Sequence, residues 1–215
     1  MKLSAGFFIL AYCASLPTSA QINKGSIVLG GQVYYASTDI NYGTQPNQKN
    51  KNGLFKISAG KAIKENSVLG ITLAYGSSKE ENNYNGSLFI NSKVNQYTFE
   101  VFYRLYKKLA RNFYFFGEFG GGYITSNQTD NDPSGNNKVK YSNTGGDLYL
   151  TPGLSYKILK ILHVEILIPR VIDFRYTVLK TKSQTDNFKE NQLIFNTNLN
   201  PTSLGFLGVG FSFIF

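Results

Sequence analysis

The sequence predicts an all-β protein: a single eight-stranded antiparallel transmembrane β-barrel, wound as an up-and-down meander. Three observations support this prediction. Apolar residues alternate with small or polar residues over eight segments, and the connections between these segments are alternately short and long. In addition, no internal stretch approaches the run of about 20 apolar residues that a membrane-spanning helix needs. A period of two places successive side chains on opposite faces of a strand.

The first four predicted strands each have one apolar face. In residues 26–37 this face carries Ile27, Leu29, Val33 and Tyr35. In residues 53–63 it carries Phe55, Ile57, Ala59 and Ile63. In residues 67–77 it carries Leu69, Ile71, Leu73 and Tyr75. In residues 92–106 it carries Tyr97, Phe99, Val101, Tyr103 and Leu105.

The last four predicted strands repeat the pattern. Residues 112–125 show Phe113, Phe115, Phe119 and Tyr123 on one face. Residues 143–156 show Leu148, Leu150, Leu154 and Tyr156. Residues 161–178 show Leu162, Val164, Ile166 and Ile168. The C-terminal strand shows Leu207, Val209, Phe211, Phe213 and Phe215.

The connections between these strands alternate in length. The short ones are predicted at residues 64–66, 107–111 and 157–160. The long polar ones are predicted as loops at residues 38–52, 78–91, 126–142 and 179–200. Short turns on one side and long loops on the other are typical of barrels in outer membranes, with the short turns in the periplasm. An even number of strands then places both termini on the periplasmic side.

The composition of the second face separates a membrane barrel from a secreted lipocalin-like barrel. In a soluble barrel the apolar residues point inward and the polar ones face water. Here the face opposite the apolar one combines Gly, Ser and Thr with a few charges, which suits the narrow interior of eight strands. Tyrosines lie toward the strand ends of the apolar face, as in an aromatic girdle at a membrane interface. We therefore expect the apolar face to contact lipid.

The N-terminal segment is typical of a secretory signal peptide. Lys2 precedes a short apolar stretch, and small residues end this stretch at Ala20. We expect residues 1–20 to be the signal peptide and residues 21–215 to form one barrel domain. The only cysteine, Cys13, lies in the predicted signal peptide, so we expect no disulfide in the barrel.

Together these features resemble the OmpX/OmpA-type eight-stranded outer-membrane barrels. The resemblance includes glycine-containing strand segments at residues 55–60 and 69–75. The C-terminal residues Phe211, Phe213 and Phe215 resemble the signal by which the barrel-assembly machinery recognises its clients. The resemblance implies a monomer in the outer membrane of a Gram-negative bacterium, in contact with outer-membrane lipid and lipopolysaccharide.

A belt of charged residues is predicted inside the barrel. It consists of Lys56, Glu100, Arg104, Glu118 and Glu165. Pairing through the 107–111 turn would place Glu100 opposite Glu118, with Arg104 nearer the periplasm. Two carboxylates that close need a neighbouring cation. We favour a structural belt of ion pairs, and a narrow ion or water path is the alternative, although an eight-stranded interior argues against an open channel.

Two prolines and one histidine are the other candidates. Pro152 and Pro169 fall within neighbouring strands, where proline cannot donate to the ladder. A bulge is the simpler interpretation, and the alternative is a lateral gap that admits lipid. His163, the only histidine, is expected at the periplasmic end without a Ser–His–carboxylate set or a metal-ligand cluster. We therefore expect no enzymatic activity, no cofactor and no metal.

Charge and loop composition limit the classes of function that we expect. Lys and Arg number 22 against 13 Asp and Glu, and these charges are dispersed along the chain without a basic run, so we expect no nucleic-acid binding. Long polar loops on a rigid scaffold favour binding of an extracellular partner. We expect a structural or interaction role through these loops. The alternative is a narrow pore, or a transport barrel that admits lipid or another hydrophobic ligand.

Overall fold

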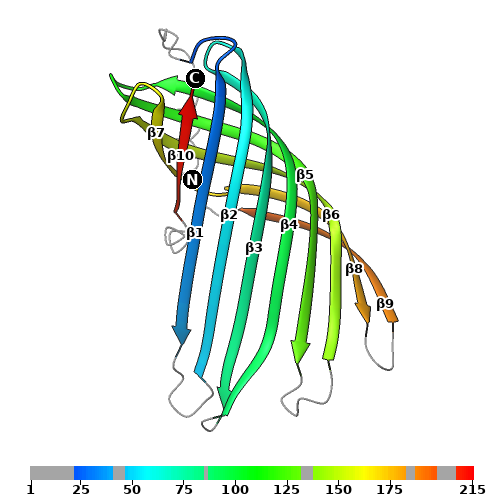
Figure 1. Cartoon of the computed structure of the whole chain (residues 1–215). Helices are drawn as coiled ribbons and strands as arrows, with labels where there is room; N and C mark the ends of the chain where they lie inside the picture. The colour runs from blue at the N-terminus through cyan, green and yellow to red at the C-terminus, as the bar shows by residue number, and fades with distance from the viewer. Residues whose placement is uncertain (1–21, 41–46, 85–86, 132–137, 183–186, 198–206) are drawn as a thin grey trace, which may run out of the picture.

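A computed structural model shows an antiparallel sheet of ten strands that closes on itself (Figure 1). The structure describes residues 22–40, 47–84, 87–131, 138–182, 187–197 and 207–215. The predicted signal peptide lies outside the described residues. No helix in the described part of the chain is long and apolar enough to cross a membrane.

The strands follow one another along the chain as a meander. They are β1 (Ile27–Ile40), β2 (Asn47–Lys64), β3 (Ser67–Tyr84), β4 (Ser87–Lys108), β5 (Phe113–Asn131), β6 (Lys138–Lys157), β7 (Leu162–Leu167), β8 (Ile172–Lys182), β9 (Asn187–Thr197) and β10 (Gly208–Ile214).

Eight of these strands form a closed ring. Each strand from β1 to β6 pairs with the next, β7 pairs with β10, and β10 pairs with β1 from Val28↔Ile214 to Val33↔Val209. This ring confirms the predicted eight-stranded antiparallel fold. The additional strands β8 and β9 continue the wall beyond β7 and β10, because β8 pairs with β6 and β9 pairs with β8.

The first residue of β1 and the last residues of the chain lie side by side, at the end of the barrel that carries the short turns. The amide of Ile27 donates to the carbonyl of Phe215 at 3.1 Å, and the Phe215 amide donates to the Ile27 carbonyl at 2.9 Å. In Figure 1 this end is at the top, and the arrowheads of β1 and β5 lie at the opposite end.

The alternation of exposure along each strand shows which face points outward. Val101 is 49% exposed and Phe99 47%, whereas the intervening Glu100 is 2% exposed. The same alternation holds around the ring, so large apolar side chains cover the outside and charged side chains are enclosed. An apolar band on the outside of a closed barrel is the arrangement that lipid requires.

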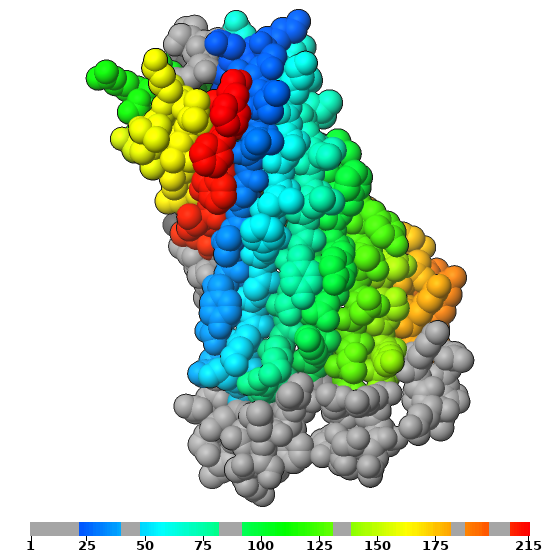
Figure 2. Space-filling model, viewed as in Figure 1, coloured from blue at the N-terminus to red at the C-terminus, as the bar shows by residue number. Residues whose placement is uncertain are grey.

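The strands continue well beyond this apolar band. About 9–11 residues of a tilted strand cross a bilayer, whereas β4 has 22 residues. The loops predicted at residues 38–52, 78–91 and 126–142 are therefore too long, because much of each predicted loop is strand in the structure. The loop predicted at residues 179–200 is wrong for the same reason, since it contains the end of β8 and all of β9. In Figure 2 the visible face of β1–β4 is a continuous wall.

A break divides the predicted seventh strand into β7 and β8. Gly153 of β6 pairs with Leu167, and Leu150 pairs with Ile172, so two residues of β6 face four residues of the partner. Pro169 lies inside this break and has no amide hydrogen to donate. The next residue, Arg170, has a positive φ of 48°. Because of this break, the side chain of Arg170 does not follow the alternation of the strand.

Candidate functional site

Charged side chains from several strands meet inside the barrel. Arg104 of β4 lies directly opposite Glu118 of β5, and its Nε donates to Glu118 Oε2 at 2.8 Å. Its Nη1 donates to Glu165 Oε1 of β7 at 3.0 Å. The side chain of Arg104 is 4% exposed, and those of both glutamates are 1% exposed. The predicted residues Arg104, Glu118 and Glu165 are thus in direct contact.

The predicted pairing of Glu100 with Glu118 is wrong. Glu100 lies opposite Gly122. The difference arises at the turn, because the amides of Leu109 and Ala110 both donate to the carbonyl of Phe113, at 2.9 and 3.3 Å. The partner of Glu100 is therefore four residues further along β5 than we expected, and a cation rather than a carboxylate lies opposite Glu118.

Lys56 of β2 joins the two glutamates. Its Nζ lies 3.2 Å from Glu118 Oε1 and 3.6 Å from Glu100 Oε2. Glu165 has further partners, since it accepts hydrogen bonds from Ser212 Oγ at 2.7 Å and from the Tyr106 hydroxyl at 3.3 Å. Each buried carboxylate in this group therefore has a cation and additional donors, as buried charge requires.

Arg170 is the residue that sequence reasoning did not place in the site. Its guanidinium contacts Glu100 and Asp147, and its Nη1 lies 3.0 Å from Asp173 Oδ1. Strand alternation assigns Asp147 and Asp173 to the inner face but assigns Arg170 to the outer one. The only sequence signal was an arginine directly after Pro169 in an otherwise apolar segment. We use the term ion-pair network for Lys56, Glu100, Arg104, Glu118, Asp147, Glu165, Arg170 and Asp173.

A layer of apolar side chains closes the barrel on the short-turn side of the ion-pair network. Its buried members are Ile22, Val28, Ala62, Val68, Phe102, Tyr106, Tyr114, Phe116 and Leu167. Ile22 precedes the first strand, yet it is only 1% exposed. It is held by Asn66, whose amide donates to the Ile22 carbonyl at 3.0 Å and whose Oδ1 accepts from the Ile22 amide at 3.2 Å. We call this layer the apolar base.

His163 lies beside the apolar base. It is 2% exposed, its Nδ1 is 3.0 Å from Ser155 Oγ, and its ring lies 5.6 Å from that of Tyr114. Within the described residues, no group of three or more His, Cys, Asp or Glu side chains is placed to hold a metal. The expected absence of enzymatic activity stays a prediction.

The other predicted residues lie apart from this interior. Phe211 and Phe215 are 45% and 60% exposed, and Phe213 lies between them with ring-centroid distances of 5.8 and 6.5 Å. Their recognition by the assembly machinery stays a prediction. At the two prolines, β6 keeps contact with its neighbour, because the Ile168 amide donates to the Pro152 carbonyl at 3.0 Å. A lateral gap there also stays a prediction.

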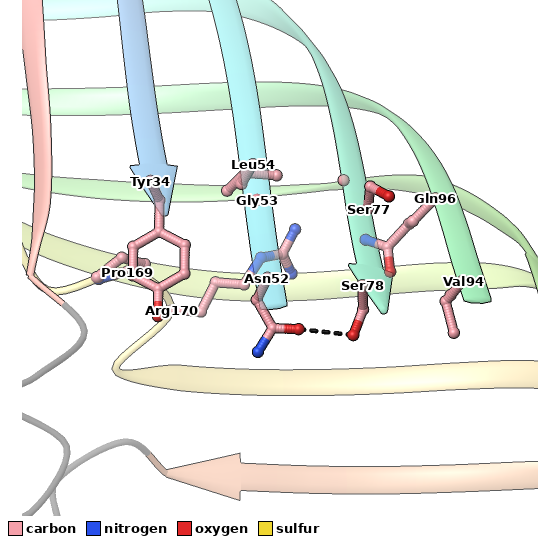
Figure 3. Close-up of a pocket in the computed structure, with 11 residues that line it drawn as sticks. Tyr34, Asn52, Gly53, Leu54, Ser77, Ser78, Val94, Gln96, Pro169 and Arg170 are labelled. Carbon is pink, nitrogen blue, oxygen red and sulfur yellow. Dashed lines mark hydrogen bonds between the residues drawn. The ribbon is translucent and has the colours of Figure 1, made fainter. Parts of the chain in front are cut away.

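A chamber lies on the other side of the ion-pair network, toward the long connections. Its volume is about 390 Å³. Figure 3 shows Tyr34 of β1, Leu54 of β2 and Val94 of β4 along its wall, with Pro169 and Arg170 behind them. Its lining is mainly apolar. At its edge, the Ser78 hydroxyl donates to Asn52 Oδ1 at 2.6 Å. Chambers of this size accept small ligands.

The closed ring, its apolar exterior and its enclosed charges define a membrane-spanning β-barrel of the outer-membrane class. The family described as "Outer membrane protein beta-barrel domain" matches residues 6–200, and the chain belongs to this family. This confirms the resemblance inferred from the sequence, and it implies a Gram-negative outer membrane. No curated protein sequence matches the chain.

Three solved structures with a similar arrangement are distant in sequence. The outer membrane protein OprG from Pseudomonas aeruginosa has 12% identity and a TM-score of 0.49, with 92% of this chain and 99% of that chain covered. A major outer membrane protein from Thermus thermophilus has 13% identity and a TM-score of 0.48, with 88% and 98% covered. The translocator domain of autotransporter NalP from Neisseria meningitidis has 14% identity and a TM-score of 0.41, and this chain, 88% covered, spans 64% of its length.

Proposed function

We propose that this protein is a non-conducting, non-enzymatic scaffold whose extended strands bind a partner outside the cell. In this proposal the short turns and both termini face the periplasm, and the long ends of β2–β5 face outward. The observation that carries the proposal is the pair of layers inside the barrel. Side chains of the apolar base and the ion-pair network occupy the interior at the level of the lipid-facing band, while β4, with 22 residues, continues about one further membrane thickness beyond it.

Planar-bilayer recording tests the non-conducting part of the proposal. We expect no unitary currents from the wild-type barrel at any salt concentration. The positive control is a variant that opens both layers, Ile22→Ala combined with Arg104→Ala, which should conduct. Reproducible wild-type currents that change on substitution of Glu100 or Arg104 would establish the narrow pore instead.

Photo-crosslinking in cells tests the binding part. A photoreactive amino acid at Lys93, on the extended part of β4, should form protein adducts. The same amino acid at Val101, which is 49% exposed in the lipid-facing band, is the matched control on the same strand and face. Adducts with protein at Val101 but not at Lys93 would contradict the proposal.

A hydrophobic-ligand barrel is the second candidate, because the chamber lies beside a discontinuity in the wall. Beyond Val33, β1 pairs with β2 but with neither β10 nor β9, and β9 pairs only with β8 among the described strands. Lipid-facing residues flank both edges, with Tyr35 at 69% and Phe195 at 65% exposure. An acyl chain from the outer leaflet could therefore reach the chamber between β1 and β9, rather than at the prolines.

A chamber-filling variant tests this second candidate. Gly76 lines the chamber, and a Cβ added there would meet its nearest atoms at 3.7 Å, so Gly76→Leu should fold and fill the space. Gly117→Leu is the control, because Gly117 does not line the chamber, an added Cβ there meets nothing within 4 Å, and strand alternation directs it outward. Native mass spectrometry of barrels from nanodiscs containing monolauroylglycerol should show one retained molecule in wild type and Gly117→Leu but none in Gly76→Leu. Equal retention by all three proteins would remove this candidate.

A further inference from the structure

Three lysines lie together on the outside of the extended wall formed by β6, β8 and β9. We call Lys140, Lys180 and Lys189 the lysine cluster. Lys180 lies directly opposite Lys189, and the β6 residue opposite Lys180 is Ser142, two residues from Lys140. All three lysines are exposed. Directly opposite side chains on antiparallel strands have Cβ atoms about 4.5–5.5 Å apart.

Placing like charges at these positions destabilises the sheet unless an anion lies between them. Within the described residues, none of the three lysines forms an ion pair. The neighbouring position on β5 is Thr129, opposite Lys140. The adjacent carboxylate on β9, Glu190, falls on the other face by strand alternation. The cluster therefore concentrates positive charge that no carboxylate among the described residues neutralises.

The lysine cluster lies just beyond the lipid-facing band. On β8 the outward residues Ile172, Phe174 and Tyr176 are 39%, 42% and 49% exposed, and Lys180 is on the same face four residues beyond Tyr176. Tyrosine marks the membrane interface. At about 3.3 Å per residue, Lys180 lies about 13 Å further along the strand than that tyrosine. A strand tilt of about 40° reduces this to about 10 Å along the membrane normal, which places the lysines on the headgroup side of the interface.

We propose that the lysine cluster binds the phosphate groups of a phosphorylated glycolipid in the outer leaflet. Lysine ammonium groups bind phosphate as compact point charges, and two facing lysines with a third diagonal to them can surround one phosphate. The apolar residues directly below hold the acyl chains of the same lipid. This inference rests on the orientation in the proposed function, in which the long strand ends face outside.

A second row of lysines provides a control inside the same molecule. Lys51, Lys79 and Lys93 lie opposite one another across β2, β3 and β4, and Lys79 is four residues beyond the girdle residue Tyr75. This row has its own carboxylate: Glu81 contacts Lys79 and lies 3.6 Å from Lys51 Nζ. Because Glu81 occupies the anion position, this row should bind phosphate more weakly than the lysine cluster.

Native mass spectrometry of the full barrel in detergent tests the proposal, with lipid A carrying two phosphates as the probe and dephosphorylated lipid A as the comparison. The wild type should retain the phosphorylated form more strongly. A lysine near an anionic lipid surface contributes about 1 kcal/mol, so Lys180→Gln with Lys189→Gln should weaken binding about 30-fold. Lys51→Gln with Lys79→Gln should change it much less. All substitutions are on the surface, and circular dichroism checks folding.

Three outcomes would overturn the proposal. The first is equal retention of the two lipid A forms by the wild type. The second is an equal loss in both double variants. The third is lysine-dependent binding of inorganic phosphate in the absence of lipid, which would identify a free anion as the ligand. Labelling of Lys180 by a membrane-impermeant amine reagent on intact cells checks the orientation separately, so failure of the proposed function is distinguishable from failure of this site.

Discussion

At the scale of single residues, the interior depends on each buried charge having a partner. Arg104 is the clearest case, because it contacts Glu118 and Glu165 at once and is 3% exposed. Its ring neighbour Phe116 lies 4.6 Å from the guanidinium. A buried ion pair adds little stability over a well-packed apolar substitute, whereas loss of one partner is strongly destabilising.

Arg104→Met should therefore lower the free energy of unfolding by about 3–5 kcal/mol, because Glu165 loses its cation and Glu118 keeps only Lys56. Urea titration of the barrel in lipid vesicles measures this. Combining Arg104→Met with Glu118→Gln and Glu165→Gln removes the uncompensated charge and should recover part of the loss. A loss below about 1 kcal/mol for Arg104→Met would show that Glu165 does not depend on Arg104 as its cation.

The pH dependence of the second lysine row is also a residue-scale prediction. The hydrogen bond from Lys79, together with the charge of Lys51, lowers the pKa of Glu81 below its usual value. Stability from this contact is fully present above the unfolded-state pKa and is lost as pH falls through the lower folded-state pKa. Acidification should accordingly release Lys51 and Lys79, and carbon-13 NMR of the labelled Glu81 carboxyl should titrate below model peptides. A midpoint at or above the peptide value would contradict the contact.

At the scale of elements, close packing of neighbouring strands is set by glycine at particular positions. A Cβ added at Gly122 of β5 would lie 2.0 Å from the Phe99 carbonyl oxygen of β4 and 2.6 Å from Glu100 Cα. At Gly117 on the same strand, an added Cβ meets nothing within 4 Å. The β4–β5 ladder therefore requires glycine at the first position and tolerates alanine at the second.

Gly122→Ala should destabilise the barrel by about 1–3 kcal/mol because the two strands must move apart. Gly117→Ala, on the outer face of the same strand, should be close to neutral. Thermal unfolding followed by gel mobility compares the two variants. Equal effects of the two substitutions would show that intrinsic strand propensity, rather than the close approach to β4, decides stability here.

The strands could be predicted from sequence only where their two faces differ. Phe55, Leu73 and Val101 alternate with inward residues because one face meets lipid and the other meets the lumen. Past the membrane both faces meet water, so Ser78, Lys79 and Glu80 carry no alternation although they continue β3. This is why the membrane strands were predicted, while the strand extensions and β9 were taken for loops.

The candidate site was predicted in part for a similar reason. Period-two alternation placed Lys56, Glu100 and Arg104 on the inner face, and the structure brings them into one network. It could not find Arg170, whose inward position depends on the break at Pro169 and on a positive φ. The register between β4 and β5 was predicted incorrectly because it depends on the backbone hydrogen bonds of the 109–112 turn. These hydrogen bonds produce no pattern of alternation in the sequence.

At the scale of the whole molecule, the account requires an apolar outside and a charged inside. The outside is covered by large apolar side chains that are 36–69% exposed, while Glu100, Glu118 and Glu165 are at most 2% exposed. In water such a surface would associate; in a bilayer it is the lipid contact. A lipid bilayer therefore explains both the apolar outer face and the charged inner face of the barrel.

The most direct test is fluorescence quenching by lipids brominated along their acyl chains. The chain has no tryptophan, so Val101→Trp and Phe102→Trp each provide one reporter, at adjacent residues that are 49% and 2% exposed. We predict strong quenching of Val101→Trp and little quenching of Phe102→Trp in folded barrels. Quenching of Phe102→Trp with an unquenched Val101→Trp would mean that the wall is turned the other way, and it would contradict the account.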